Sequence, residues 1–93
     1  MSVTWRSDVN ALSFQPQGHA GQCLIHRRAF QTILGLGSPP TPEQCLASYG
    51  ELHEVCELAA AAKIRRAALT CEANFHLTSR DVLRTYRTVT LTG

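Results

Sequence analysis

The sequence predicts an α+β fold in which a small antiparallel sheet of three to four strands packs on two helices. Residues 41–67 repeat apolar side chains at spacings of three and four, which is typical of one amphipathic helix. Shorter segments on both sides of it alternate apolar and polar residues, as strands with one buried face do. The predicted order is β-β-α-α-β followed by a short C-terminal helix. At this length we expect a single domain, 1–93, with loose ends at 1–8 and 88–93.

The first part of the chain predicts a hairpin. Residues 11–15 alternate, Pro16-Gln17-Gly18 is a turn signal, and residues 20–26 form the second alternating segment. Residues 3–6 also alternate, and they fit either a frayed first strand or an ordered arm. The simplest arrangement is an antiparallel pair between the segments that flank the turn.

Two helices are predicted next. Residues 26–34 fit a short helix that ends at Gly35 and Gly37, and Ser38-Pro39-Pro40 forms a stiff connector. The long helix follows with a strong start signal, because Thr41, Pro42 and Gln44 occupy the N-cap, first-turn and capping-box positions. Its apolar stripe comprises Leu46, Tyr49, Leu52, Val55, Cys56, Ala59 and Ala62. Gly50 inside it marks either a kink or a close packing contact.

The last part of the chain predicts a strand and a terminal helix. Residues 69–77 alternate without interruption, which favours a strand. Thr78 or Ser79 suits a helix N-cap, with Asp81 in a capping-box position, and we expect a helix over 79–87 with a loose tail. The strand-forming residues from Thr85 onward leave an added strand as the alternative. The predicted core comprises Leu12, Phe14, Cys23, Ile25, Phe30, Ile33, Leu46, Leu52, Val55, Cys56, Ala59, Leu69, Cys71, Phe75 and Leu77.

Composition narrows the classes of function. The chain is 44% hydrophobic and 17% charged, which is typical of a globular protein with some extra buried surface. No apolar run is long enough to span a membrane, and the first residues lack a signal peptide, so we expect a cytoplasmic protein without membrane contact. The four cysteines are then expected to be free thiols. The net charge is +2, and the charges are unevenly distributed along the chain: the N-terminal part is acidic, and the C-terminal part from Lys63 onward is basic.

Several short motifs resemble one family. They are Asn10 and Phe14 in one short strand; Gly21, Cys23 and Ile25 in the strand that follows it; Ala60, Lys63 and Ile64 at the end of the long helix; and Leu77, Thr78, Ser79 and Asp81 at the close of the last strand. In this order they resemble the small bacterial proteins grouped as domain of unknown function 1488, over roughly residues 3–82. The chain departs from the pattern at Val82, where an aromatic residue is expected, and in the tail to Gly93. Because the family is uncharacterised, the resemblance implies a fold and a bacterial source but no activity.

Catalytic and metal chemistry find little support in the residue pattern. Cys45 and Cys56 share a helix face but lie three turns apart, roughly 16 Å, so they cannot bind one zinc ion. His53 and Cys56 supply at most half of a metal site. A thiol nucleophile needs a base within reach, and Cys23 has one only if the side chain of His26 or His76 meets it across strands. The glycine-containing segment 35–38 is followed by two prolines and does not match a phosphate-binding loop. We therefore expect no catalytic residue, cofactor or metal, and no enzymatic activity.

Two binding functions remain. The first is a protein-interaction role, with a homo-oligomer or another protein as the partner, which low surface charge and an alanine-rich helix would suit. The second is weak binding of nucleic acid, or a regulatory role, through a basic C-terminal patch, because three arginines recur at spacings of four and three near the end of the chain. The candidate contact residues for either partner are Lys63, Arg65, Arg66, Arg80, Arg84 and Arg87.

Overall fold

The described residues form four strands and three helices. The computed structural model describes residues 3–92, and the side chains of residues 3–89. In chain order the elements are β1 (Val3–Arg6), β2 (Ala11–Phe14), β3 (Cys23–His26), α1 (Arg27–Leu34), α2 (Pro42–Ala67), β4 (Phe75–Leu77) and α3 (Ser79–Thr92). The α+β class is confirmed, and residues 3–6 are a strand of the sheet. No helix in the described part of the chain is long and apolar enough to cross a membrane.

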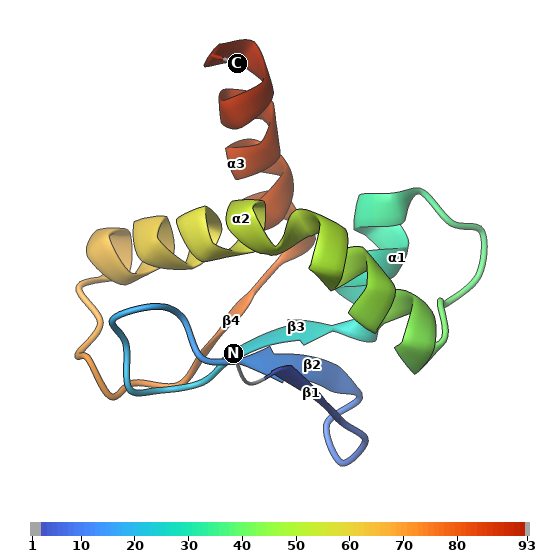
Figure 1. Cartoon of the computed structure of the whole chain (residues 1–93), viewed down its shortest axis with the longest axis horizontal. Helices are drawn as coiled ribbons and strands as arrows, with labels where there is room; N and C mark the ends of the chain where they lie inside the picture. The colour runs from blue at the N-terminus through green and yellow to red at the C-terminus, as the bar shows by residue number, and fades with distance from the viewer. Residues whose placement is uncertain (1–2, 93) are drawn as a thin grey trace.

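The sheet has the strand order β1-β2-β3-β4. The predicted hairpin is confirmed, because β2 and β3 pair antiparallel with Leu12 opposite Ile25, and β1 pairs antiparallel with the outer edge of β2. β4 instead runs parallel to β3, with Leu77 opposite Ile25, so the sheet is mixed and not wholly antiparallel. Helices α1 and α2 form the long connection from β3 to β4 that parallel pairing requires. Figure 1 shows the helices on one side of this sheet.

The strand predicted over 69–77 is wrong for its first six residues. β4 is only Phe75–Leu77, because β3 begins at Cys23 and offers no ladder partner further back. Residues 69–74 are a loop held by isolated hydrogen bonds, in which Ala20 N donates to Cys71 O at 2.7 Å and Gln22 N donates to the Asn74 side chain at 2.8 Å. Cys71 is therefore exposed, and its placement in the predicted core is also wrong.

The ends of α1 and α2 form as the sequence predicts. Gln44 N donates to Thr41 Oγ1 at 3.1 Å, and Thr41 N donates to the Gln44 side chain at 2.7 Å, so the capping box is complete. Gly35 ends α1 with a φ of 66°, in the left-handed region that suits glycine. At the exposed Gly50 a Cβ atom would meet no atom within 4 Å, so there is no close packing contact at this residue.

Helix α3 is longer than predicted. It runs over Ser79–Thr92, where a helix over 79–87 with a loose tail was expected. Its threonines bond back to the preceding turn, Thr85 Oγ1 to Asp81 O at 3.1 Å and Thr88 Oγ1 to Arg84 O at 3.0 Å. These bonds satisfy the hydroxyl groups inside a helix, so the strand-forming composition of the tail does not prevent it. In Figure 1 the C-terminal part of α3 stands clear of the sheet and of the other two helices.

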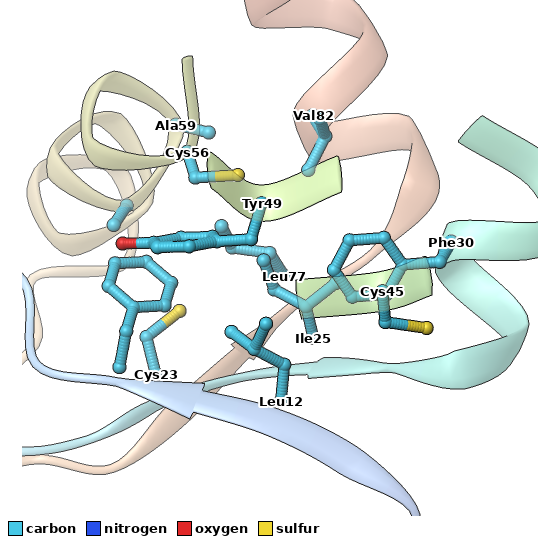
Figure 2. Close-up of a cluster of buried hydrophobic side chains, with 12 residues drawn as sticks. Leu12, Cys23, Ile25, Phe30, Cys45, Tyr49, Cys56, Ala59, Leu77 and Val82 are labelled. Carbon is cyan, nitrogen blue, oxygen red and sulfur yellow. The ribbon is translucent and has the colours of Figure 1, made fainter. Parts of the chain in front are cut away.

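The core lies between the sheet and the helices (Figure 2). Eight predicted core residues are buried: Leu12, Phe14, Cys23, Ile25, Phe30, Cys56, Ala59 and Leu77. Ile33, Leu46, Leu52, Val55 and Phe75 are partly buried and pack against them. The prediction missed Ala11, Cys45, Tyr49, Ala60 and Val82, and the predicted Leu69 is only partly buried and lies outside the cluster. Tyr49 completes the cluster, with its ring centroid 5.1 Å from that of Phe14.

Candidate interaction surface

The structure divides the six candidate contact residues into separate groups. Lys63 and Arg66, on the last turns of α2, both reach the carboxylate of Asp81 at the start of α3. Arg65 is exposed on another side of α2. The three arginines of α3 lie on one side of that helix. The single basic patch predicted from the sequence is therefore not formed by all six residues, because two of them serve the contact between helices.

Asp81 is the centre of that contact. Lys63 Nζ donates to Asp81 Oδ2 at 2.8 Å and to His76 O at 2.8 Å, and Arg66 donates to Asp81 Oδ1 at 3.2 Å. Thr78 completes a capping box, since its N–H and hydroxyl donate to Asp81 and its hydroxyl accepts from Asp81 N. Burial alone would raise the pKa of Asp81, but the hydrogen bonds from Lys63 and Thr78 outweigh it and lower the pKa to about 2.

The arginine row, which we define as Arg80, Arg84 and Arg87, faces solvent along α3. All three side chains are exposed, and spacings of four and three place them on one side of the helix. Together with Ser79 and Leu83 they line a shallow hollow of about 550 Å³. Within the described residues none of the three forms an ion pair. The row therefore presents three exposed cations on one side of α3.

Next to the row lies the apolar notch, a hollow of about 270 Å³ between α1, α2 and α3. It is lined by Ile33, Leu34, Leu52, Val82, Leu83 and Tyr86. Leu83 lines both the notch and the hollow beside the arginine row, so the two features form one continuous surface. Val82 is buried at its base, whereas Tyr86 is 48% exposed and Val89, one turn further along α3, is 39% exposed. We call the notch and the row together the α3 surface.

The sequence did not reveal the notch. Val82 and Tyr86 lie four residues apart and so share a side of α3, but their meeting with Ile33 and Leu34 of α1 depends on how β4 brings α3 next to α1. The signal in the sequence is the recurrence of apolar residues at 82, 83, 86 and 89, which is typical of one side of a helix.

Three of the four cysteines, Cys23, Cys45 and Cys56, are buried, and Cys71 is exposed. Burial raises the pKa of the Cys56 thiol to about 12, and it raises the pKa of Cys23 and Cys45 as well. The rings of His26 and His76 lie 5.7 Å from each other, and both side chains are exposed. Cys23, in contrast, is buried. No group of three His, Cys, Asp or Glu side chains in the described part of the chain is placed to hold a metal ion.

A separate hollow lies between α2, the β2–β3 loop and the loop before β4, with a volume of about 520 Å³. Two of the residues that line it hold the loop by hydrogen bonds. The buried His19 donates from Nε2 to Ala73 O at 2.7 Å, and Gln17 N donates to the Glu57 carboxylate at 2.9 Å. The remaining walls are mostly apolar and include Leu58, Ile64 and Leu69.

Comparison with known proteins identifies the fold. The chain is similar to the crystal structure of a protein of unknown function from the DUF1488 family of Shewanella loihica PV-4, with a TM-score of 0.65 and 20% sequence identity. The match covers 82% of this chain and 85% of that chain. No family model matches the sequence, and neither does any curated protein. The chain thus has the DUF1488-like fold that its motifs predicted, and because the similar protein is itself of unknown function, the likeness assigns no activity.

Proposed function

We propose that this protein is a non-enzymatic interaction module that associates with a second copy of itself through the α3 surface. One observation carries the proposal: the apolar stripe of α3 is buried at Val82 but continues into the exposed Tyr86 and Val89, where the helix leaves the body. Exposed apolar side chains beside a charged rim are typical of surfaces that bind another protein.

Charge on the same molecule favours a second copy as the partner. The α3 surface carries the three cations of the arginine row, and the side of α2 that faces away from the core carries the exposed Glu51 and Glu54. Each copy therefore offers both a basic and an acidic surface. Complementary charges of this kind guide encounter and fix the orientation of two partners. A second copy would also add buried area to a chain of 93 residues, whose own core is small.

Sedimentation velocity from low micromolar to submillimolar concentration tests the proposal. We expect the wild-type protein to form a dimer or larger species as concentration rises, and Tyr86→Asp to remain a monomer because it places a charge beside the notch. Thr70→Asp is the matched control, since Thr70 is exposed in the loop before β4 and away from α3. A wild-type protein that is monomeric over the whole range would refute self-association.

A second candidate function, binding of nucleic acid, has one observation in its favour. The arginine row lines a hollow about 550 Å³ in volume and its cations are exposed, as phosphate contacts require. Three such contacts predict that binding of a duplex weakens with salt with a logarithmic slope of about −3. A titration of a labelled duplex at low salt measures it, and Arg84→Ala with Arg87→Ala should weaken the binding further. If the label shows no change at low salt, this candidate is excluded.

A further inference from the structure

We infer that the α3 surface of one copy receives the outer side of α2 from the second copy. The receiving residues are the notch and the arginine row, and the inserted residues are Glu51, Glu54 and Leu58, which we call the α2 strip. Leu58 enters the apolar notch while the two glutamates face the arginine row. This inference rests on the proposed self-association and names the surface that it uses on the partner.

The α2 strip forms one line on the helix. Residues 51, 54 and 58 recur at spacings of three and four, so they share a side, and that side is opposite the buried Cys45, Tyr49 and Cys56. Leu58 is 53% exposed, more than any other large apolar side chain for which the structure describes a position. Neither glutamate forms an ion pair within the described residues. Leu58 also borders the hollows between α2 and the β2–β3 loop, and the strip presents this exposed apolar side chain with two carboxylates beside it that form no ion pair among the described residues.

The dimensions of the two surfaces agree. Glu51 and Leu58 are seven residues apart on α2, and Arg80 and Arg87 are seven residues apart on α3, so each pair spans about 10 Å of helix. Leu83, in the wall of the notch, is adjacent to Arg84. A leucine in the notch therefore places a carboxylate one turn away on its own helix within reach of the arginine row.

The charges along α2 also fix the direction of the contact. The acidic residues precede Leu58, whereas Arg65 lies two turns after it on the same side of the helix. Only one orientation places the glutamates over the arginine row and keeps Arg65 away from it. In the reverse orientation cations would face cations, which opposes association.

The size of the notch favours a side chain over a small-molecule ligand. Its volume of about 270 Å³ is below the range of roughly 300–1,000 Å³ that is usual for ligand pockets. A single apolar anchor that fills a pocket at the centre of an interface is the usual arrangement between proteins. Leu58 is such an anchor, and it is part of every copy.

Pairing of α3 with the α3 helix of the second copy is the competing arrangement. It would bury the same notch, but it would bring two arginine rows together, because Leu83 lies directly beside the row. Like charges at such distances disfavour the contact. The α2 strip offers opposite charge and is therefore the better partner.

Two charge-reversed variants test the inference. The row variant carries Arg84→Glu and Arg87→Glu, and the strip variant carries Glu51→Arg and Glu54→Arg. We expect each variant alone to associate at least about tenfold more weakly than the wild type, because like charges then meet. An equimolar mixture should recover the wild-type association. In the mixture the reversed row meets the reversed strip, and the unchanged row meets the unchanged strip.

The remaining outcomes separate this inference from the proposed function. All four side chains are exposed, so circular dichroism of each variant should match the wild type and show that the fold is intact. If the wild type associates but the mixture does not recover, or if the strip variant associates as the wild type does, the α2 strip is not the partner surface and self-association stands. A wild-type protein that never associates overturns both.

Discussion

The Nζ atom of Lys63, on α2, lies 2.8 Å from Oδ2 of Asp81, in the first turn of α3. Both side chains are mostly buried, with exposed fractions of 22% and 9%. This pair, with Arg66 on the other carboxylate oxygen, fixes the base of α3 on α2 while the rest of α3 extends away from the body. Two of the six candidate contact residues, Lys63 and Arg66, therefore orient the helix on which the α3 surface lies.

The Asp81 carboxylate is expected to stabilise the fold at neutral pH. Its folded-state pKa of about 2 lies below the ordinary value of 3.8, so the ionised form is favoured by folding. The linkage relation gives a contribution of about 2 kcal/mol that is fully present above pH 5 and is lost as the pH falls toward 2. Urea unfolding followed by the fluorescence of Trp5, the one tryptophan of the chain, measures it. Asp81→Asn should be less stable by about the same amount at pH 7, with a flatter dependence below pH 5.

The control for that prediction is Asp8→Asn, because Asp8 is exposed and pairs only with the exposed Arg6 in the described structure. Its free energy of unfolding at pH 7 should stay close to that of the wild type. If Asp81→Asn loses stability between pH 5 and pH 2 as steeply as the wild type, the carboxylate of Asp81 is not responsible for the acid sensitivity.

Two glycines are expected to respond oppositely to alanine. A Cβ atom on the buried Gly21 would overlap the carbonyl of Ala73, so Gly21→Ala should lower the free energy of unfolding by about 2 kcal/mol or more. At Gly50 the same atom meets nothing within 4 Å in a helix interior, so Gly50→Ala should raise it by up to about 1 kcal/mol. Urea unfolding of the two variants checks both signs. Equal effects of the two substitutions would show that the approach of Gly21 to residue 73 is not close.

One of the four thiols is expected to react rapidly in the folded protein. Cys71 is exposed, whereas Cys23, Cys45 and Cys56 are buried. Labelling with a chromogenic disulfide reagent should give one fast equivalent per chain, and denaturant should release the remaining three. Cys71→Ser should remove the fast phase. Fast reaction of a second thiol in that variant would contradict the position of the core.

The termini of the helices could be predicted because their causes are local. The capping box of Thr41 and Gln44 and the left-handed Gly35 use residues that are neighbours in the chain. The strand over 69–77 was mispredicted because alternation alone does not supply a partner: β3 is only four residues long, and residues 69–74 have no strand beside them. Threonine composition also misled the prediction of α3, since hydroxyl bonds to the preceding turn allow that helix to continue.

The α3 surface was predictable only in part. The arginine row follows from helical spacing and is seen in the sequence. The notch does not, because it needs residues from three helices that only the parallel placement of β4 brings together. The pairing of Lys63 and Arg66 with Asp81 was hidden for the same reason, since opposite charges eighteen and fifteen positions apart carry no local pattern.

Cysteine cross-linking tests the proposed contact between Leu58 of one copy and the notch of the other most directly. In a Cys71→Ser background, a chain with Leu58→Cys is mixed with a chain with Leu83→Cys and oxidised gently. We expect a disulfide-linked heterodimer to dominate, because Leu58 of one copy enters the notch beside Leu83 of the other. Glu43→Cys in place of Leu58→Cys is the control, since residue 43 lies about 22 Å along the same helix. Linkage of two Leu83→Cys chains with no excess of the mixed pair would contradict the account and would place α3 against α3.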